Sequence, residues 1–315
     1  MWPAAKPGGG ILRCIIPQVT TGSDKARLNT PPRMQDPVVV TISSQVAYGH
    51  VGNCATVPAL QMLGFEVLAI PTVLLAHHPG HGPAKGRMLP ADELADLVQG
   101  ITAIGALARC CAMLTGYLGL PGTAAVAVGA VTQLRAARPG ALYLCDPVIG
   151  DNGRVYVRDG VEQAIRSQLL PLADIVTPNH FELERLSGQP VHTIDQAITA
   201  ARSLLPLGPG IVVVTTVQHE GTSAREVESL AVTADQVWRA TSPRLLSVQN
   251  GAGDLLAALL LGHLALGRPL PDALGQAVSA VHAVLAASAG EPEMRLSAAR
   301  QWLQQAPEMP VQRLH

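Results

Sequence analysis

A glycine-rich turn carries the carboxylate with the clearest chemical potential in the sequence. Gly251, Ala252 and Gly253 stand directly before Asp254, and an apolar run follows at residues 255–261. The run predicts a buried helix, so the turn opens at a helix N-terminus, where free N–H groups and the helix dipole favour an anion. Asp254 is then either a helix cap or a general base that takes a proton from a hydroxyl while the amides hold phosphate oxygens.

Two further carboxylates follow an apolar stretch at residues 141–145. Asp146 comes directly after this predicted strand, and Asp151 lies five residues on. Carboxylates at the carboxyl ends of parallel strands lie where α/β sheets bind ligands, and such a pair can hold Mg²⁺ directly or through water. The alternative is a turn built on the Asp-Pro and Gly-Asp pairs.

The segment from Thr177 to Glu182 has the spacing of a helix start. Asn179 can cap a helix, and Glu182, three residues on, can reach back in a capping box. A carboxylate at the ligand edge of a sheet can also order Mg²⁺ and its water shell, so both roles stay open.

Three histidines crowd the loop at residues 76–82, among them His78. Because no carboxylate or cysteine accompanies them, a mobile lid over a ligand is favoured over a metal site.

Alternating apolar segments and helical patterns must position these groups. Strands are predicted at 37–42, 65–70, 110–115, 141–145 and 211–216, with helices between them, which is the pattern of βαβ units in an α/β protein. Proline and glycine break any regular element in residues 1–36, which we expect to be a disordered extension or the result of a mistaken start site. One domain is predicted at 37–307, followed by a tail at 308–315.

Composition narrows the classes of partner and compartment. The net charge is −1 with acids and bases interspersed, so no footprint for nucleic acid or an anionic membrane is expected. The chain lacks a run of about 18 apolar residues of the kind that spans a membrane. Five cysteines without Cys-x-x-Cys spacing indicate free thiols in a reducing cytoplasm.

Several of these segments resemble known kinases. The Gly-Ala-Gly-Asp stretch at 251–254 is similar to the anion hole and catalytic base of ribokinase-like small-molecule kinases. The segments at 44–53, 115–117, 145–151 and 177–182 resemble pyridoxal kinases in particular. The resemblance covers about residues 37–290 and implies a ribokinase-like three-layer α/β sandwich, with a mostly parallel central sheet and helices on both faces.

The resemblance also implies an activity: ATP-dependent phosphorylation of the 5′-hydroxymethyl group of pyridoxal, and of pyridoxine or pyridoxamine. Members use Mg²⁺, often respond to K⁺ and form homodimers. By this resemblance Asp254 is the catalytic base and residues 251–253 form the anion hole. The implied substrate contacts are Ser44, Val73, His78, Tyr117 and Asp254, the implied ATP contacts are Asp146, Thr177, Asn179, Glu182 and Thr215, and the implied metal ligands are Asp146, Asp151 and Glu182.

Two positions depart from the family pattern and leave alternatives open. Leu75 replaces a phenylalanine that packs on the substrate ring, and Pro79 replaces a threonine. A hydroxymethylpyrimidine kinase has the same fold but commonly carries cysteine where this chain has Asp254. A sugar or nucleoside kinase would have only the Gly-Ala-Gly-Asp stretch in common, and a non-catalytic vitamer-binding relative would keep the fold without the reaction.

Overall fold

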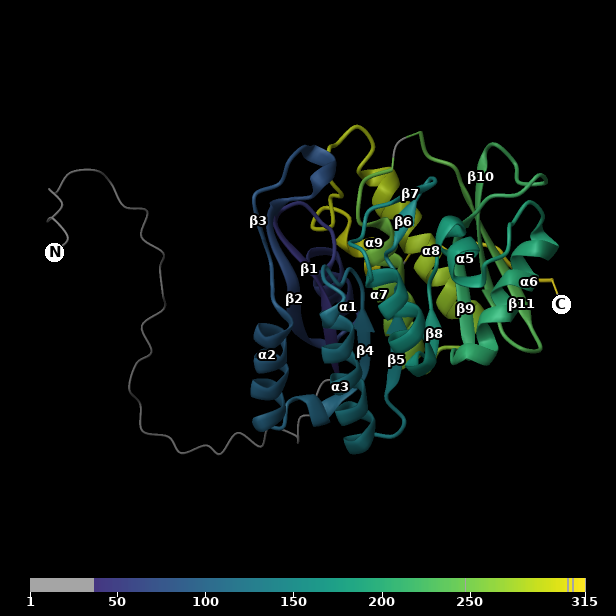
Figure 1. The fold of residues 1–315 in the computed structure, drawn as a ribbon. Helices are drawn as coiled ribbons and strands as arrows, with labels where there is room; N and C mark the ends of the chain where they lie inside the picture. Colours follow the sequence, from purple (N-terminus) through teal and green to yellow (C-terminus); the bar gives the residue numbers. More distant parts are fainter. Residues whose placement is uncertain (1–36, 247, 305, 308, 315) are drawn as a thin grey trace, which may run out of the picture. The chain divides into compact units, whose positions relative to one another are not determined.

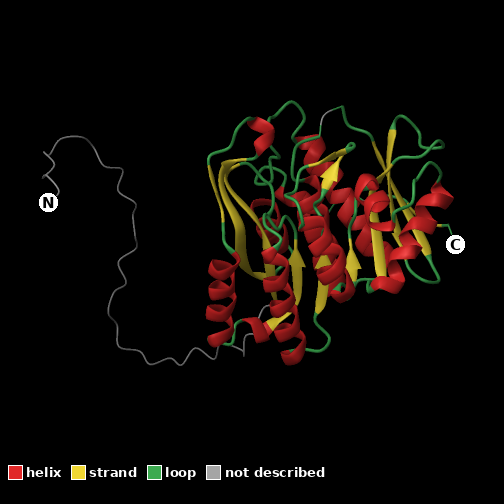
Figure 2. Cartoon of the chain, viewed as in Figure 1, coloured by secondary structure: helices red, strands yellow, loops and turns green. Residues whose placement is uncertain are grey.

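The computed structural model describes residues 37–314 apart from 247, 305 and 308. The expected disorder of residues 1–36 therefore falls outside the described residues. Within them, a ten-stranded sheet runs in the order β12-β11-β10-β9-β8-β5-β4-β1-β2-β3 (Figures 1 and 2). Its strands are β1 (Val38–Tyr48), β2 (Glu66–His77), β3 (Gly86–Met88), β4 (Cys110–Thr115), β5 (Leu142–Cys145), β8 (Ile175–Val176), β9 (Ile211–Val217), β10 (Glu226–Val232), β11 (Val237–Pro243) and β12 (Val311–Arg313).

The centre of the sheet is parallel and its two edges are antiparallel. Neighbouring strands run parallel from β2 through β1, β4, β5 and β8 to β9. Strand β3 adds antiparallel to β2, and β10, β11 and β12 add antiparallel beyond β9. A separate two-stranded hairpin consists of β6 (Gly150–Asp151) and β7 (Arg154–Val155).

Two apolar clusters cover the two faces of the sheet. One cluster packs beneath α2 (Ala91–Ala103), α3 (Gly122–Ala137), α4 (Val161–Ala164), α5 (His180–Ser187) and α6 (Ile194–Leu204). The other packs beneath α1 (Asn53–Met62), α7 (Ala252–Ala265), α8 (Leu270–Ala287) and α9 (Arg300–Gln304). Short helical turns lie at Pro79–His81, Leu107–Arg109, Ile165–Leu169, Leu170–Leu172 and Leu205–Leu207. The predicted three-layer sandwich is confirmed.

Helix α7 is the buried helix that the apolar run predicted. Every residue from 255 to 263 in it is buried, and each fully buried leucine contributes on the order of 1.5–3 kcal/mol to the hydrophobic stabilisation. This anchors the helix N-terminus at a fixed place against the sheet. Helix α8 is long and apolar enough to cross a membrane, but 56% of it is buried inside the domain, as is typical of a core helix.

Two boundaries differ from the sequence-based expectation. Strand β1 continues to Tyr48, although Ser43 and Ser44 interrupt its apolar pattern, because it stays paired with β2 across an irregularity between Ser43 and Gln45. At the other end of the chain the predicted tail at 308–315 contains β12, which pairs with β11. The paired sheet therefore extends past residue 307.

The order of the strands creates a switch point for ligands. From β1 the chain continues to β2 on one side, whereas β4 pairs with β1 on the other side. In open α/β sheets the crevice at the carboxyl ends of such strands is the usual place for a ligand. The segments that follow β1, β4, β5 and β8 all begin at this edge. They carry most of the predicted site residues.

Candidate active site

The N-terminus of α7 forms a pocket of backbone amides. Gly251 precedes the helix with a φ of 90°, and a Cβ atom there would lie 1.9 Å from the carbonyl oxygen of His50, so only glycine fits. The N–H groups of Ala252 and Gly253 lie in the first turn, where no carbonyl of the helix can accept from them. A Cβ atom on Gly253 would meet nothing within 4 Å. The first turn of α7 therefore has open space beside Gly253, which leaves room for an anion near its amides.

Asp254 lies in the same first turn and is oriented from across the domain. Its carboxylate accepts the N–H of Gly52, in the loop after β1. Burial raises the pKa of the Asp254 carboxyl to about 6, although this bond and the N–H of Asp254 itself lower it. A carboxylate with this pKa is ionised at neutral pH and still able to accept a proton, as a general base must be.

The turn after β4 can approach Ser43 and Asp254 closely because residue 116 is glycine. A Cβ atom on Gly116 would lie 2.6 Å from Oγ of Ser43 and 3.7 Å from Oδ1 of Asp254. The Ser43 hydroxyl is buried and has no hydrogen-bond partner. Any larger residue at position 116 would clash with the Ser43 side chain and touch the carboxylate of Asp254.

Asp146 lies at the end of β5 and is 8% exposed. Its Oδ1 accepts a hydrogen bond of 3.0 Å from Oγ1 of Thr177, at the end of β8. Burial holds the pKa of Asp146 well above its ordinary value, and the charges of Glu182 and Asp254 raise it further. Three carboxyl groups are therefore close enough to repel one another, and a bound cation would relieve this repulsion.

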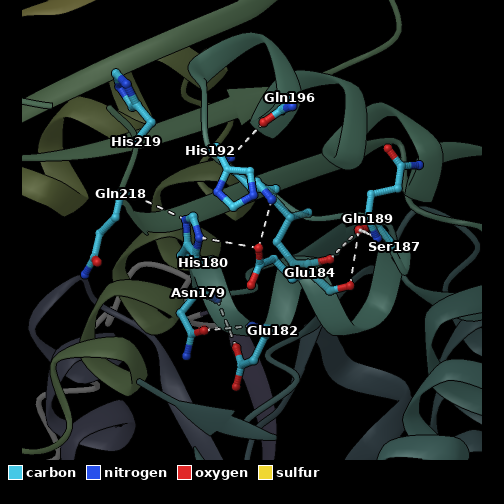
Figure 3. A network of polar contacts seen from close by, with 12 residues as sticks. Asn179, His180, Glu182, Glu184, Ser187, Gln189, His192, Gln196, Gln218 and His219 are labelled. Atoms are coloured by element: carbon cyan, nitrogen blue, oxygen red, sulfur yellow. Dashed lines mark hydrogen bonds and ion pairs between the residues drawn. The ribbon is translucent and has the colours of Figure 1, made fainter. Parts of the chain in front are cut away.

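The predicted capping box at the start of α5 is confirmed (Figure 3). Oδ1 of Asn179 accepts the N–H of Glu182 at 2.9 Å, and Oε2 of Glu182 accepts the N–H of Asn179 at 3.0 Å. The other oxygen, Oε1, accepts the N–H groups of Ile149 and Gly150 at 2.7 and 3.3 Å. Burial raises the pKa of Glu182 to about 7 against these hydrogen bonds. Glu182 thus holds the loop after β5 in place.

The three predicted metal ligands do not converge. The carboxylate of Asp151 is exposed and accepts two hydrogen bonds from Asn152. Among the residues that the structure describes, no group of three His, Cys, Asp or Glu side chains lies close enough to hold a metal ion. Of the three, Asp146 fits Mg²⁺: its Oδ1 accepts a hydrogen bond from Thr177, and the nearby charges of Glu182 and Asp254 favour a cation beside it.

The predicted substrate contacts surround the ends of β1, β2 and β4. Ser44 is 8% exposed, and its Oγ lies 2.2 Å from the place of a Cβ atom on Gly52. His78 accepts the N–H of Gly80 on Nδ1, and burial lowers its pKa. Tyr117 is half-buried, and burial raises the pKa of its phenol. Val73 is only 1% exposed, so its contact with a ligand stays a prediction.

The last predicted nucleotide contact, Thr215, lies near the end of β9. Its N–H donates to the carbonyl of Pro178 at 2.9 Å, which joins β9 to the start of α5. Directly after β9, the N–H of Gln218 donates to Nδ1 of His180 at 3.3 Å, and Nε2 of His180 lies 3.9 Å from Oε1 of Glu184 (Figure 3). These contacts fix the two segments that would line a nucleotide.

Sequence reasoning missed four residues that build this site. Asn53 is 1% exposed and ties the loop after β1 to its surroundings, donating to the carbonyls of Ser43 and Ile70. Burial raises the pKa of Tyr156, and the charges of Glu182 and Asp146 raise it further. The other two are Gly52 and Gly116. Asn53 and Gly52 stand in the segment 44–53, whose resemblance to pyridoxal kinases was the available signal.

An amide pocket beside a carboxylate, at the switch point of a mostly parallel sheet, is the arrangement of a ribokinase-like kinase of small molecules. Residues 93–295 match the model of the phosphomethylpyrimidine kinase family.

Curated relatives and solved structures narrow this class. The chain is 44% identical over 281 residues to pyridoxal kinase PdxY of Rubrobacter xylanophilus, covering 88% of this chain and 97% of that protein. It is 43% identical to pyridoxal kinase PdxY of Deinococcus radiodurans, covering 78% and 85%. The structure of pyridoxal kinase from Leishmania donovani in complex with ADP and pyridoxamine is 30% identical, with a TM-score of 0.84 over 89% of this chain and all of that one. The chain belongs to the pyridoxal kinase family, as the resemblance predicted.

Proposed function

We propose that the protein transfers the γ-phosphoryl group of ATP to the 5′-hydroxymethyl oxygen of pyridoxal, and also accepts pyridoxine and pyridoxamine. The product is the 5′-phosphate, and the reaction salvages vitamin B6. One observation carries the proposal: Asp254, with a pKa of about 6, stands in the same first turn as the amides of Ala252 and Gly253, where the space beside Cα of Gly253 is open. The pyridoxal kinase relatives support the choice of substrate.

In this mechanism Asp254 accepts the proton of the substrate hydroxyl. A bond forms between the substrate oxygen and the γ-phosphorus, while the bond from that phosphorus to the bridging oxygen breaks and ADP leaves. The amides of Gly251, Ala252 and Gly253 neutralise the charge on the phosphoryl oxygens. The N–H of Gly52 keeps the carboxylate of Asp254 turned toward the reacting oxygen.

The nucleotide end of the site is assigned to the residues that follow β5, β8 and β9. Asp146 would hold Mg²⁺, which when bound neutralises charge on the ATP phosphates. Thr177 orients Asp146, while Asn179 and Glu182 fix the loop after β5 that faces the phosphates. Thr215 contacts the nucleotide directly. Asp151 acts on the ion only through water, and K⁺ serves as an activating ion.

The substrate ring lies between the ends of β1 and β4. Ser44 contacts the ring, Tyr117 lies beside it, and Val73 and His78 bound it from β2 and the following turn. Leu75 fills the substrate side of the site less than the phenylalanine of the family pattern would, and Pro79 replaces a threonine there. We therefore expect the turnover of pyridoxal, pyridoxine and pyridoxamine to differ.

A direct assay separates this function from a second candidate. The family model is that of phosphomethylpyrimidine kinases, which favours hydroxymethylpyrimidine as the alternative substrate. Phosphate ester formation from ATP is measured with pyridoxal, pyridoxine, pyridoxamine and hydroxymethylpyrimidine, with and without chelation of divalent ions. Turnover of hydroxymethylpyrimidine alone would support the proposed phosphoryl transfer but show that pyridoxal is not the substrate. Binding of pyridoxal without turnover of any compound would indicate a non-catalytic relative.

We further infer a homodimer in the cytoplasm. The described cysteines Cys54, Cys110, Cys111 and Cys145 are free thiols, which fits a reducing compartment. Light scattering of the purified protein tests the dimer, because a mass of 32.8 kDa would indicate a monomer instead.

A further inference from the structure

The turn that follows α8 touches three separate parts of the active site. We call residues 288–294 the post-α8 turn. Gln249, directly before the anion hole and 7% exposed, donates from Nε2 to the carbonyls of Ser288 and Glu291 at 2.8 and 3.0 Å. Cε of Met294 lies 3.0 Å from the place of a Cβ atom on Gly251. The post-α8 turn therefore packs directly behind the anion hole.

One side chain of this turn, Glu293, joins two further segments. Its Oε2 accepts the N–H of His50 at 3.0 Å, in the loop after β1. Its Oε1 pairs with Nε2 of His81, at the end of the short helical turn Pro79–His81. The side chain of Glu293 is 10% exposed, so water screens these contacts little. A Cβ atom on Gly49 would lie 2.7 Å from Oε2, and its φ of 104° also requires glycine.

The segment held by His81 contains His78, one of the predicted substrate contacts. We call residues 77–82 the lid. The ring of His81 meets the rings of Tyr48 and His77 edge to face, with centroids 5.7 and 6.0 Å apart. A Cβ atom on Gly80 would lie 3.0 Å from Nδ2 of Asn250, in the anion-hole turn. The lid is thus closed against the turn that carries the free amides.

We propose that Glu293 is a positioning residue that holds the lid and the loop after β1 against the anion hole. The proposal rests on the pyridoxal kinase function inferred above. A closed lid excludes water from the transferred phosphoryl group and keeps the vitamer beside Asp254. Glu293 touches no reacting atom, and it acts through His81 and His50.

The test compares two substitutions in the same turn. In Glu293→Gln the amide oxygen can still accept the N–H of His50, but the charge that attracts His81 is lost. Glu291→Gln neutralises an exposed carboxylate whose Oε1 lies 3.4 Å from Nη1 of Arg295. The side chains of Glu291 and Arg295 are 47% and 54% exposed. The second variant is the matched control, since surface ion pairs contribute little.

Three readouts distinguish positioning from a general loss of structure. For Glu293→Gln we expect KM for pyridoxal to rise on the order of tenfold, with KM for ATP nearly unchanged, since one charge-assisted hydrogen bond is lost. The ratio of ATP hydrolysed to vitamer phosphorylated should also rise. Hydrogen exchange of the lid amides should become faster than in wild type and in Glu291→Gln. His81→Gln should reproduce these changes, and combining it with Glu293→Gln should add little.

Equal KM values and equal lid exchange in Glu293→Gln and Glu291→Gln would overturn the proposal. The exchange measurement needs no turnover, so it decides the role of Glu293 even if the wild-type protein phosphorylates no vitamer. In that case the absence of turnover would count against the proposed function alone.

Discussion

Replacing Asp254 with asparagine should slow turnover strongly and at the same time stabilise the fold. Asparagine has the same shape and can still accept the N–H of Gly52, so the site keeps its geometry. Without a group that takes the proton, kcat should fall about 10²–10⁴-fold. In wild type, kcat/KM should fall about tenfold per pH unit below pH 6, because the carboxylate is then protonated.

The gain in stability follows from the sign of the pKa shift. The pKa of Asp254 rises from 3.8 to about 6 on folding, so the unfolded chain holds the charge more readily. The ionised carboxylate therefore lowers the free energy of unfolding above pH 6, and this loss disappears as the pH falls through 6 toward 3.8. Because Asp254 is partly exposed, we expect about 1–3 kcal/mol rather than more. Asp254→Asn should raise Tm by about 2–6 °C at pH 7.5, and much less at pH 4.

Turnover assays across pH 5–9 and thermal unfolding at pH 4 and 7.5 measure both effects. Asp96→Asn, at an exposed position on α2, is the control for neutralising one acid. A variant at position 254 that keeps turnover within tenfold of wild type would refute the general base. A lower Tm for Asp254→Asn than for wild type at pH 7.5 would show that the ionised carboxylate of Asp254 does not destabilise the folded state.

Three further substitutions test the amide pocket and its support. Gly251→Ala should unfold at a lower temperature than wild type, since its Cβ atom would lie 1.9 Å from the carbonyl oxygen of His50. Gly253→Ala should keep the wild-type Tm and lose turnover, because its methyl group enters open space that the phosphate needs. Equal Tm values for the two alanine variants would contradict this steric argument. Glu182→Ala should lower the free energy of unfolding by about 1–3 kcal/mol and raise KM for ATP, because the N–H groups of Ile149 and Asn179 lose their acceptor. Chemical denaturation would measure the free energy of unfolding, and assays at varied ATP concentration would measure KM. A wild-type KM for ATP in Glu182→Ala would show that Glu182 does not support the nucleotide site.

The sequence predicted what local patterns can determine. The apolar run of α7 and the Asn179–Glu182 spacing each depend on residues within one helix, and both are present in the structure. Alternating strands and helices likewise indicated the α/β sandwich. Such patterns carry periodicity and capping information that needs no knowledge of distant contacts.

Long-range contacts escaped the sequence for a physical reason. The hydrogen bond from Gly52 to Asp254 joins segments about 200 residues apart, and the pair of His81 and Glu293 does the same. Nothing in the spacing of these residues marks them as partners. Strand β1 was predicted too short because Ser43 and Ser44 look polar in sequence, whereas both are buried in the fold.

The two edges of the sheet have a consequence for how the protein avoids edge-to-edge aggregation. Each edge is a three-residue strand with an arginine, Arg87 in β3 and Arg313 in β12. Unpaired long strand edges recruit other chains, and short charged edge strands prevent this. Removing the last residues would uncover the seven-residue strand β11. A truncated chain should therefore aggregate through open backbone groups before it loses its core, and solubility on expression should depend on the final strand.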